Sequence, residues 1–326
     1  MRMVIAALFA SLSMLFASLV QGAPVVINFP HVVAEDTPKG QMADKFRDLV
    51  QEKLAGKVKI EVYPNSQLVT DKEVVDKLLA GEIQMGAPSL SKLKKYTNKL
   101  GLFDLPFLFT GIGAVDKFKR SEEGQSLLKS MEPLGIRGLG YLHNGMKQLS
   151  ANKPLYLPAD AEGLKFRIMS SDVLVAQFEA LDAIPVKKPF KEVYNLLKTG
   201  QIDGQENTWS NIYSKKFYEV QDYITESDHG YLGYMVLTSS AFWDALDPAI
   251  RKELEKMLKE AIAFGNQIAI QKAIFDKQSV VDARKARVIT LKQKEKEKWI
   301  DVMNPVWHQF DDQFGKEIID AAYASN

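Results

Sequence analysis

Residues 163–171, Gly163-Leu164-Lys165-Phe166-Arg167-Ile168-Met169-Ser170-Ser171, alternate apolar and basic side chains as a β-strand does and then reach residues that cap helices. The apolar side chains share one predicted face, which leaves Lys165 and Arg167 on the other. An apolar helical run from Val173 to Leu181 follows the cap. This order of strand, cap and helix is one unit of an α/β fold, and it places Arg167 beside a helix N-terminus.

A guanidinium in that position is suited to binding an anion. Free backbone N–H groups, the positive end of the helix dipole and the forked guanidinium together favour a carboxylate over a neutral group. We therefore interpret Arg167 as the anchor of an organic acid. The alternative is an arginine on an exposed strand edge that forms a salt bridge with a neighbour.

The rest of the chain repeats the alternation of short apolar strands and helices. Strands are predicted at 25–29 and 58–63, helices at 41–53 and 71–80, a late strand at 233–240 and a long amphipathic helix over 248–284. A length of 326 residues exceeds one typical core, so two domains are expected. These patterns predict an α/β chain of two halves, or lobes, which the long helix bridges and between which the chain passes more than once.

The expected division begins with a signal peptide over 1–22. Lobe I is predicted to comprise 23–146 plus about 236–280, and lobe II to comprise 147–235 plus about 281–326. A weak ungapped repeat supports two related halves, because residues 73–83 match residues 192–202 as helix, glycine stop and strand start. The segments after these strands, 85–91 and 204–211, then occupy equivalent strand ends, where open α/β sheets bind ligands.

The N-terminus has the pattern of a secretory signal peptide. A positive charge in Met1-Arg2-Met3 precedes the apolar stretch Val4 to Val20, and small residues follow at Gly22-Ala23. Cleavage is expected near Ala23; an uncleaved membrane anchor is the alternative. The chain has no cysteine, so lipid attachment to cysteine, disulfides and thiolate metal sites are excluded. A periplasmic protein that is not a lipoprotein is therefore predicted.

Composition limits the partners further. Apolar residues make up 46% of the chain and charged residues 25%, and the net charge is +1, which gives no electrostatic reason to expect nucleic acid. The four histidines are scattered, with no two at ligand spacing, so no metal centre and no cofactor are expected. We therefore expect a monomer whose partner in the cleft is a small molecule.

Several ordered segments resemble one family, the extracytoplasmic solute-binding proteins of TRAP transporters (the DctP family), in the branch that takes four-carbon dicarboxylates. The similarity covers essentially the whole mature chain, and it implies a two-lobed periplasmic binding protein whose lobes are joined by crossing strands. It rests on the following segments: 31–40 (HVVAEDTPKG), 87–92 (APSLSK), 103–107 (FDLPF), 144–148 (NGMKQ), 163–167 (GLKFR), 189–194 (PFKEVY), 203–207 (DGQEN) and 229–234 (HGYLGY).

The resemblance implies a role for particular residues. Arg167 resembles the family's signature arginine, which forms a two-pronged salt bridge with a substrate carboxylate. Asn207 resembles the asparagine that hydrogen-bonds the bound acid, and Lys147 lies where relatives place a second cationic or polar ligand. Phe190 resembles the aromatic residue over the ligand, Ser89 faces it from the opposite lobe, and His31 stands where the first strand meets the cleft. Ser170, which follows the strand of Arg167 at the predicted helix cap, is also expected to contact the substrate.

One position departs from the family pattern and leaves the acid open. Thr208-Trp209 stands where proline commonly follows the Glu-Asn pair, so Trp209 either narrows the pocket, stacks on a ligand or fills the core. Each of three residues has a structural alternative. Lys147 is then a solvated lysine, Asn207 a turn residue after a strand, and Phe190 a core residue. The resemblance implies capture of succinate, fumarate, malate or a longer or aromatic relative, delivered to a small and a large integral-membrane permease subunit.

Two alternatives belong to other functional classes. One is a ligand receptor for a sensor kinase, which has the same fold and pocket. The other is a periplasmic acid–base enzyme, but the sequence has no nucleophile elbow, metal set or informative pairing of histidine with carboxylate. We therefore expect a binding protein that makes and breaks no bond.

Overall fold

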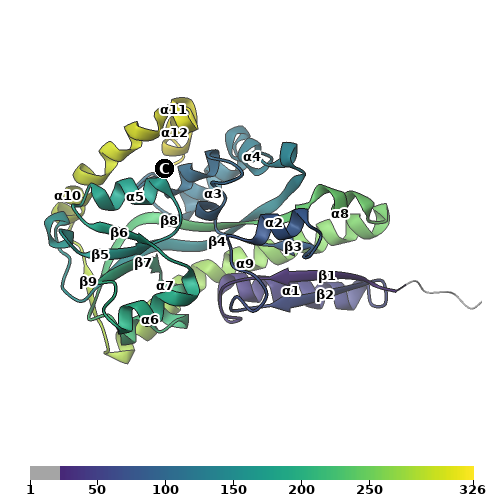
Figure 1. The fold of residues 1–326 in the computed structure, drawn as a ribbon, viewed down its shortest axis with the longest axis horizontal. Helices are drawn as coiled ribbons and strands as arrows, with labels where there is room; N and C mark the ends of the chain where they lie inside the picture. Colours follow the sequence, from purple (N-terminus) through teal and green to yellow (C-terminus); the bar gives the residue numbers. More distant parts are fainter. Residues whose placement is uncertain (1–22) are drawn as a thin grey trace, which may run out of the picture.

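The computed structural model describes residues 23–326, so the predicted signal peptide over 1–22 lies outside the described residues. Figure 1 shows two lobes, with β1, β2 and α1 in one and β5, β6 and β7 in the other. The strands are β1 (Val25–Pro30), β2 (Val58–Tyr63), β3 (Met85–Gly86), β4 (Ile136–Ala151), β5 (Lys165–Ile168), β6 (Ile184–Lys187), β7 (Gly204–Thr208), β8 (Tyr223–Ser239) and β9 (Arg287–Thr290).

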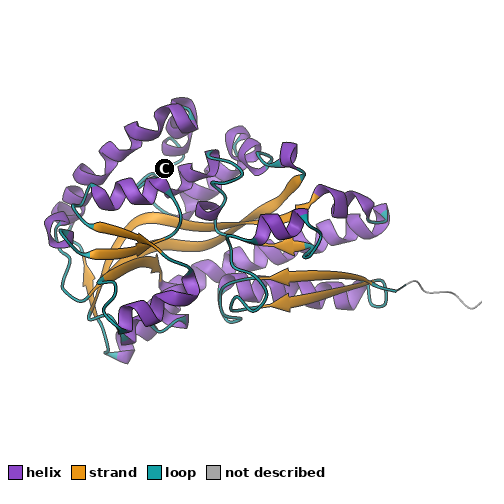
Figure 2. Cartoon of the chain, viewed as in Figure 1, coloured by secondary structure: helices purple, strands orange, loops and turns teal. Residues whose placement is uncertain are grey.

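Helices cover the sheets and account for much of the surface in Figure 2. The α-helices are α1 (Pro38–Lys53), α2 (Val74–Leu79), α3 (Ile112–Arg120), α4 (Glu122–Leu128), α5 (Asp172–Glu179), α6 (Val193–Lys198), α7 (Trp209–Ser214), α8 (Ser240–Ala245), α9 (Pro248–Ala283), α10 (Gln293–Met303), α11 (Asp311–Phe314) and α12 (Lys316–Tyr323). Short 3₁₀ helices are η1 (Leu90–Lys92), η2 (Lys99–Asp104), η3 (Glu132–Leu134), η4 (Pro158–Ala161), η5 (Phe190–Glu192), η6 (Phe217–Glu219) and η7 (Asn304–Phe310). None of the helices within 23–326 has both the length and the apolar character that crossing a bilayer requires.

Two long antiparallel strands join the lobes. β4 and β8 pair from Ile136 opposite Ser239 to Ala151 opposite Tyr223, and they form the centre of a sheet with the order β3-β8-β4-β7-β5-β6. β9 pairs with β8, while β1 and β2 form a separate parallel pair. The pairing of β4 with β8 shifts register at three places, one of them between His143 and Gly145, so the connection bends instead of running flat. The predicted α/β fold with crossing strands is confirmed.

Helix α9 accompanies these strands along their length. It spans 36 residues, and its buried side chains run from Leu254 to Val280. Figure 1 shows it extending from α8 in one lobe to the turn before β9 in the other. The prediction of a long helix over 248–284 that bridges the lobes is therefore confirmed.

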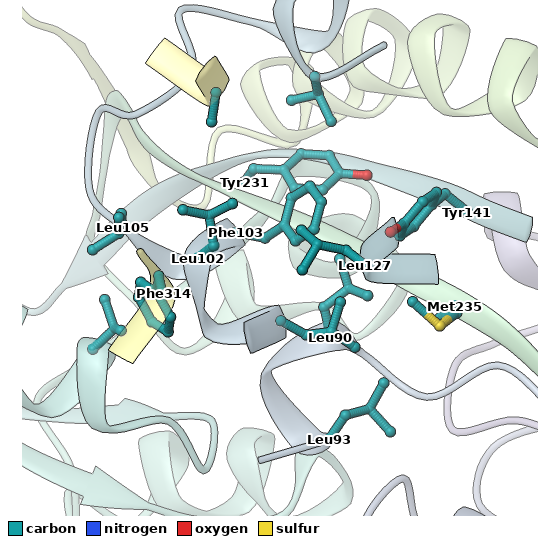
Figure 3. Close-up of a cluster of buried hydrophobic side chains, with 14 of the residues drawn as sticks. Leu90, Leu93, Leu102, Phe103, Leu105, Leu127, Tyr141, Tyr231, Met235 and Phe314 are labelled. Atoms are coloured by element: carbon teal, nitrogen blue, oxygen red, sulfur yellow. The ribbon is translucent and has the colours of Figure 1, made fainter. Parts of the chain in front are cut away.

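Four hydrophobic clusters form the core. One, in Figure 3, includes Phe103, Tyr231 and Met235 together with Phe314 of α11, which lies near Leu102 and Leu105. A second joins β1, α1 and the first half of α9. The other two belong to the second lobe: one holds Phe166 and Phe178, and the other packs α6 and α7 against Val280. The strand ends that face the cleft are thus supported from both sides of the sheet.

The predicted repeat is present in the structure. Helices α2 and α6 have equivalent lengths, and each ends at a glycine with positive φ, Gly81 at 73° and Gly200 at 65°. The backbone hydrogen bonds that follow also match, with Ile83 N donating to Lys77 O and Ile202 N donating to Leu196 O. The two units then enter β3 and β7 of the same sheet. Each half therefore delivers a strand end to the cleft through the same local geometry.

The equivalent glycines generate a stability prediction. Gly81→Ala and Gly200→Ala should each lower the free energy of unfolding by about 1 kcal/mol, because an added Cβ meets no atom within 4 Å and only the left-handed backbone is penalised. The matched control is Gly113→Ala, which has equal space and a helical backbone in α3, and which should be neutral or stabilising. Urea unfolding of the three variants measures this; equal effects at all three positions would contradict it.

Candidate functional site

A cavity of about 380 Å³ lies at the strand ends and is lined by both lobes. Ser89, Lys92 and Tyr234 line it from the first lobe and its connecting strand, and Arg167, Asn207 and Phe190 line it from the second. Ser170 lines it as well. Five of the predicted site residues are therefore brought together here: Arg167, Asn207, Phe190, Ser89 and Ser170.

Arg167 is the most heavily constrained of these side chains. It is the third residue of β5, between β6 and β7, and it is only 2% exposed. Its Nε donates to the carbonyl of Lys188 at 3.0 Å, and no carboxylate of residues 23–326 lies within 4 Å of its guanidinium. Burial lowers the pKa of Arg167 to about 10, so the side chain stays charged at neutral pH. The protein thus holds a buried cation that has no ion-pair partner within 23–326, while Glu206, Asp71 and Glu192 act on it only from beyond 4 Å.

The strand, cap and helix around Arg167 form as the sequence predicts. Phe166 and Ile168 are buried in the core below the strand, Lys165 is exposed, and Ser171 Oγ caps α5 by accepting from Leu174 N at 3.4 Å. The Phe190 ring lies near the guanidinium, with its centroid 6.0 Å from Arg167 Cζ. An aromatic face at this distance stabilises a cation, and it leaves the N–H donors of the guanidinium free to bind an anion.

Asn207 is oriented by its neighbours. Its Oδ1 accepts from Asn211 Nδ2 at 2.7 Å and from Thr208 N at 3.2 Å. Because the oxygen is occupied, the amide nitrogen is the group left to donate to an anion in the cavity. Asn207 and Arg167 therefore present donors from adjacent parallel strands.

The first lobe contributes hydroxyl groups and a fixed ion pair. The phenol oxygen of Tyr234 accepts from Asn144 Nδ2 at 2.8 Å, so its own proton can be donated. Ser89 lies beside Tyr234 in an isolated bridge, and its N donates to Asp71 at 3.0 Å. Lys39 lies 3.9 Å from Asp71 and 3.6 Å above the Tyr234 ring, which partly balances the only carboxylate that lines the cavity.

Positive charge dominates the cavity and its mouth. The lining contains six basic side chains and one acidic side chain, although the whole chain carries a net charge of only +1. The basic residues are Lys72, Lys92, Arg167, Lys187, Lys188 and Lys191. A cleft lined by one sign of charge attracts and concentrates ligands of the other sign. Within 23–326, no group of three or more His, Cys, Asp or Glu side chains is arranged to hold a metal ion.

Lys147 lies away from the cavity, in a buried network, and this differs from its predicted role. Its Nζ is 2.7 Å from Glu206 Oε2, which is 3.0 Å from His229 Nε2. Burial by itself raises the pKa of Glu206, but Lys147 and His229 outweigh it and hold that pKa at about 2. The charge of Lys147 is therefore balanced by Glu206, and Lys147 is not among the residues that line the cavity.

Trp209 and His31 also lie outside the lining. Trp209 begins α7, is 5% exposed and packs with Ile212 and Phe217, so it fills the core of the second lobe. His31 follows β1, next to the lining residues Val32 and Val33, and neither ring nitrogen has a hydrogen-bond partner among the described residues. Burial and the nearby Lys39 lower the pKa of His31 to about 3, so its ring is neutral.

Lys92, Asn211 and Tyr234 are among the lining residues that sequence reasoning did not identify as ligand contacts. A signal was present for each. Lys92 and Tyr234 end two of the family segments, and the ungapped repeat, extended by its constant offset, aligns Lys92 with Asn211. The structure shows that both of these residues belong to a short helix directly after the equivalent strand end.

Comparison with known proteins adds independent information. Residues 29–313 match the family model described as bacterial extracellular solute-binding protein, family 7. The C4-dicarboxylate-binding periplasmic protein DctP of Shewanella loihica is 59% identical over 93% of this chain and 90% of its own length. A protein of the same name from Vibrio cholerae is 47% identical over 93% of this chain and 91% of its own length.

A solved structure gives the same result for the fold. A TRAP periplasmic solute-binding protein from Shewanella oneidensis with bound succinate is 57% identical, covers 93% of this chain and all of its own, and superimposes with a TM-score of 0.92. The similarity extends over the cleft and both lobes, so the fold is that of the two-lobed periplasmic solute-binding proteins.

The buried pair generates a prediction that separates a structural lysine from a ligand contact. Lys147→Met should cost about 3–5 kcal/mol of unfolding free energy, because it leaves Glu206 charged and unpaired in the core. Adding Glu206→Gln should recover part of that loss, since both buried charges are then gone. Denaturant unfolding of the two single variants and the double variant measures the coupling. A Lys147→Met protein of full stability that has lost its ligand would instead make Lys147 a binding residue.

Proposed function

The chain belongs to family 7 of the bacterial extracellular solute-binding proteins, and we propose that it captures a C4-dicarboxylate and delivers it to a membrane transporter. One observation carries the proposal. Arg167 is 2% exposed, faces the cavity and has no ion-pair partner within 23–326. A buried cation is costly unless an anion and hydrogen bonds compensate it. A ligand carboxylate, bound by the guanidinium fork and by Asn207, supplies that compensation.

The size of the site and the relatives indicate the class of acid. A cavity of about 380 Å³ is at the small end of ligand pockets, which suits a compact diacid. The Shewanella loihica relative is named for C4-dicarboxylates, and structural relatives were solved with succinate and with L-malate, the latter from Pseudomonas aeruginosa. We assign Arg167, Asn207, Ser89, Ser170 and Phe190 to the substrate site. The ligand is bound and released unchanged, because the family binds solutes and the lining has no nucleophile–base pair.

Closure of the two lobes explains capture. Residues of both lobes contact a ligand together only when the cleft is closed, so binding shifts the population toward the closed form. The sequence predicts lobe I as 23–146 with about 236–280, and lobe II as 147–235 with about 281–326. We change this division at one place: the segment from η7 to α12 packs into the cluster of Phe103 and Val115, so we assign 304–323 to lobe I.

Transport requires export and membrane partners. The apolar N-terminal stretch supports secretion through a cleaved signal peptide, and the lack of cysteine excludes a lipid anchor on cysteine. We propose a periplasmic monomer that hands its ligand to a small and a large integral-membrane permease subunit. The closed form is the state that such a permease recognises.

The first prediction from this proposal concerns Arg167. Arg167→Ala and Arg167→Lys should each weaken binding of succinate or malate by about 2–5 kcal/mol, because alanine removes the cation and lysine lacks the two-pronged geometry. Isothermal titration and ligand-induced thermal shift of the mature chain measure this. The unliganded variants should remain folded, since the guanidinium makes only one hydrogen bond within 23–326, to the carbonyl of Lys188. Full affinity in Arg167→Ala would refute the site.

The basic mouth leads to a kinetic prediction. The association rate constant for succinate should fall about tenfold as salt rises from about 0.01 to 0.15 M, because the Debye length shortens from about 30 to 8 Å. The dissociation rate constant should change little, since the bound acid is shielded from solvent. Stopped-flow measurements on wild type and on Lys72→Gln/Lys191→Gln, which removes two exposed lining charges, test this. A salt-independent association rate would contradict electrostatic steering.

A further inference from the structure

Cations from both lobes line the cavity, and of those with any burial only Arg167 has been assigned a role as a ligand contact. A second candidate is Lys92, the last residue of η1. Its Nζ donates to Ser170 Oγ at 3.1 Å, and Ser170 lies two residues after β5, the strand that carries Arg167. The lysine therefore reaches across the cleft to the strand end where the first carboxylate is proposed to bind.

Lys92 has no ion-pair partner within 23–326, a feature that it shares with Lys72, Lys188 and Lys191 of the lining. Its contact with Ser170 of the opposite lobe sets it apart from them. Lys94 and Lys187 are both paired with Asp172, and Lys95 is paired with Asp76. For Lys92, no carboxylate of 23–326 lies within 4 Å, although it is partly buried. Lys147, the other candidate for a second anchor, is neutralised by Glu206. The cavity thus holds a buried cation, Arg167, and a partly buried cation, Lys92, neither of which has an ion-pair partner within 23–326.

The local structure fixes the lysine in this position. Lys92 N donates to Ser89 O at 2.9 Å, and the neighbouring Ser91 Oγ donates to the buried Asp104 at 2.6 Å. The segment aligned by the repeat places Asn211 equivalently in the second lobe, and Asn211 also lines the cavity. At this equivalent position one lobe has the amide of Asn211 and the other has the cation of Lys92.

We propose that Lys92 binds the second carboxylate of the ligand, so that Lys92 and Arg167 form a two-cation clamp which selects dicarboxylates over monocarboxylates and holds the lobes together. The inference rests on the proposed function and names the group that determines its specificity. A dianion between the two cations satisfies both charges, whereas a monocarboxylate on Arg167 leaves Lys92 partly buried and unpaired. Burial, and then Arg167, lower the pKa of Lys92 to about 8, which is consistent with two cations that face one space.

The test compares three variants of the mature chain by isothermal titration. Lys92→Gln should weaken succinate binding by at least about 30-fold, and Lys92→Arg, which keeps the charge, should retain affinity to within about tenfold. Lys259→Gln is the matched control, because it removes an exposed positive charge of α9 that does not line the cavity and should change affinity less than about threefold. A loss smaller than tenfold in Lys92→Gln, or an equal loss in Lys92→Arg, would overturn the proposal.

A second ligand separates failure of this inference from failure of the proposed function. Succinamate has the shape of succinate with one carboxylate replaced by a neutral amide. Lys92→Gln should bring the affinities for succinate and succinamate close together, while Arg167→Ala should weaken both. If wild type bound no C4-dicarboxylate, the proposed function itself would fail. If wild type bound succinate and Lys92→Gln preserved its preference over succinamate, only the role of Lys92 would fail.

The pH dependence provides an independent readout. Lys92 is charged below a pH of about 8 and becomes neutral above it, so succinate affinity should fall as pH rises through that range. The charged groups around it are Arg167, Asp71, Asp104 and Lys72. Lys39 also has a pKa lowered by burial to about 8, so the wild-type profile alone does not identify the group. Lys92→Arg should remove the decline; an unchanged profile in that variant would contradict the assignment.

Discussion

The structure depends on keeping one guanidinium charged and nearly free of solvent at the centre of the cleft. The strand of Arg167 has parallel neighbours on both sides, its apolar face is packed against Phe178, and its Nε is held by the Lys188 carbonyl. These contacts fix the position of the guanidinium without neutralising it. A rigid cation of this kind has little conformational entropy left to lose when an anion binds, which favours affinity.

The repeat explains why donors from distant parts of the sequence meet. Each half uses a short helix, a left-handed glycine and a strand that enters the shared sheet beside β4 or β8. The strand ends therefore face one another, and the side chains that follow them, from Ser89 to Lys92 and from Asn207 to Asn211, line one cavity. The crossing strands and α9 connect these ends, so a contact made at the cleft can change how the lobes are held.

Local patterns in the sequence were sufficient for the fold and for the prediction that Arg167 lies at the strand end that lines the cavity. Strand β2 and helix α9 match their predicted ranges almost residue for residue, and the alternation around Arg167 placed that side chain correctly on the cleft side. Other features depend on long-range pairing and were not visible. The full length of β8, which begins at Tyr223, is set by its ladder with β4, and α2 is shorter than predicted, beginning only at Val74.

The predicted role of Lys147 shows where a sequence reaches its limit for charged residues. Lys147 and Lys92 are both lysines in segments typical of the family, and no local pattern distinguishes a cation that is paired inside the fold from one that is left for a ligand. That distinction is decided by Glu206 and His229, which β7 and β8 bring next to Lys147. A buried charge already paired with a carboxylate gains little from a further anion, whereas an unpaired one gains much. The pairing of each buried charge therefore identifies the binding groups more reliably than residue type or position along the chain.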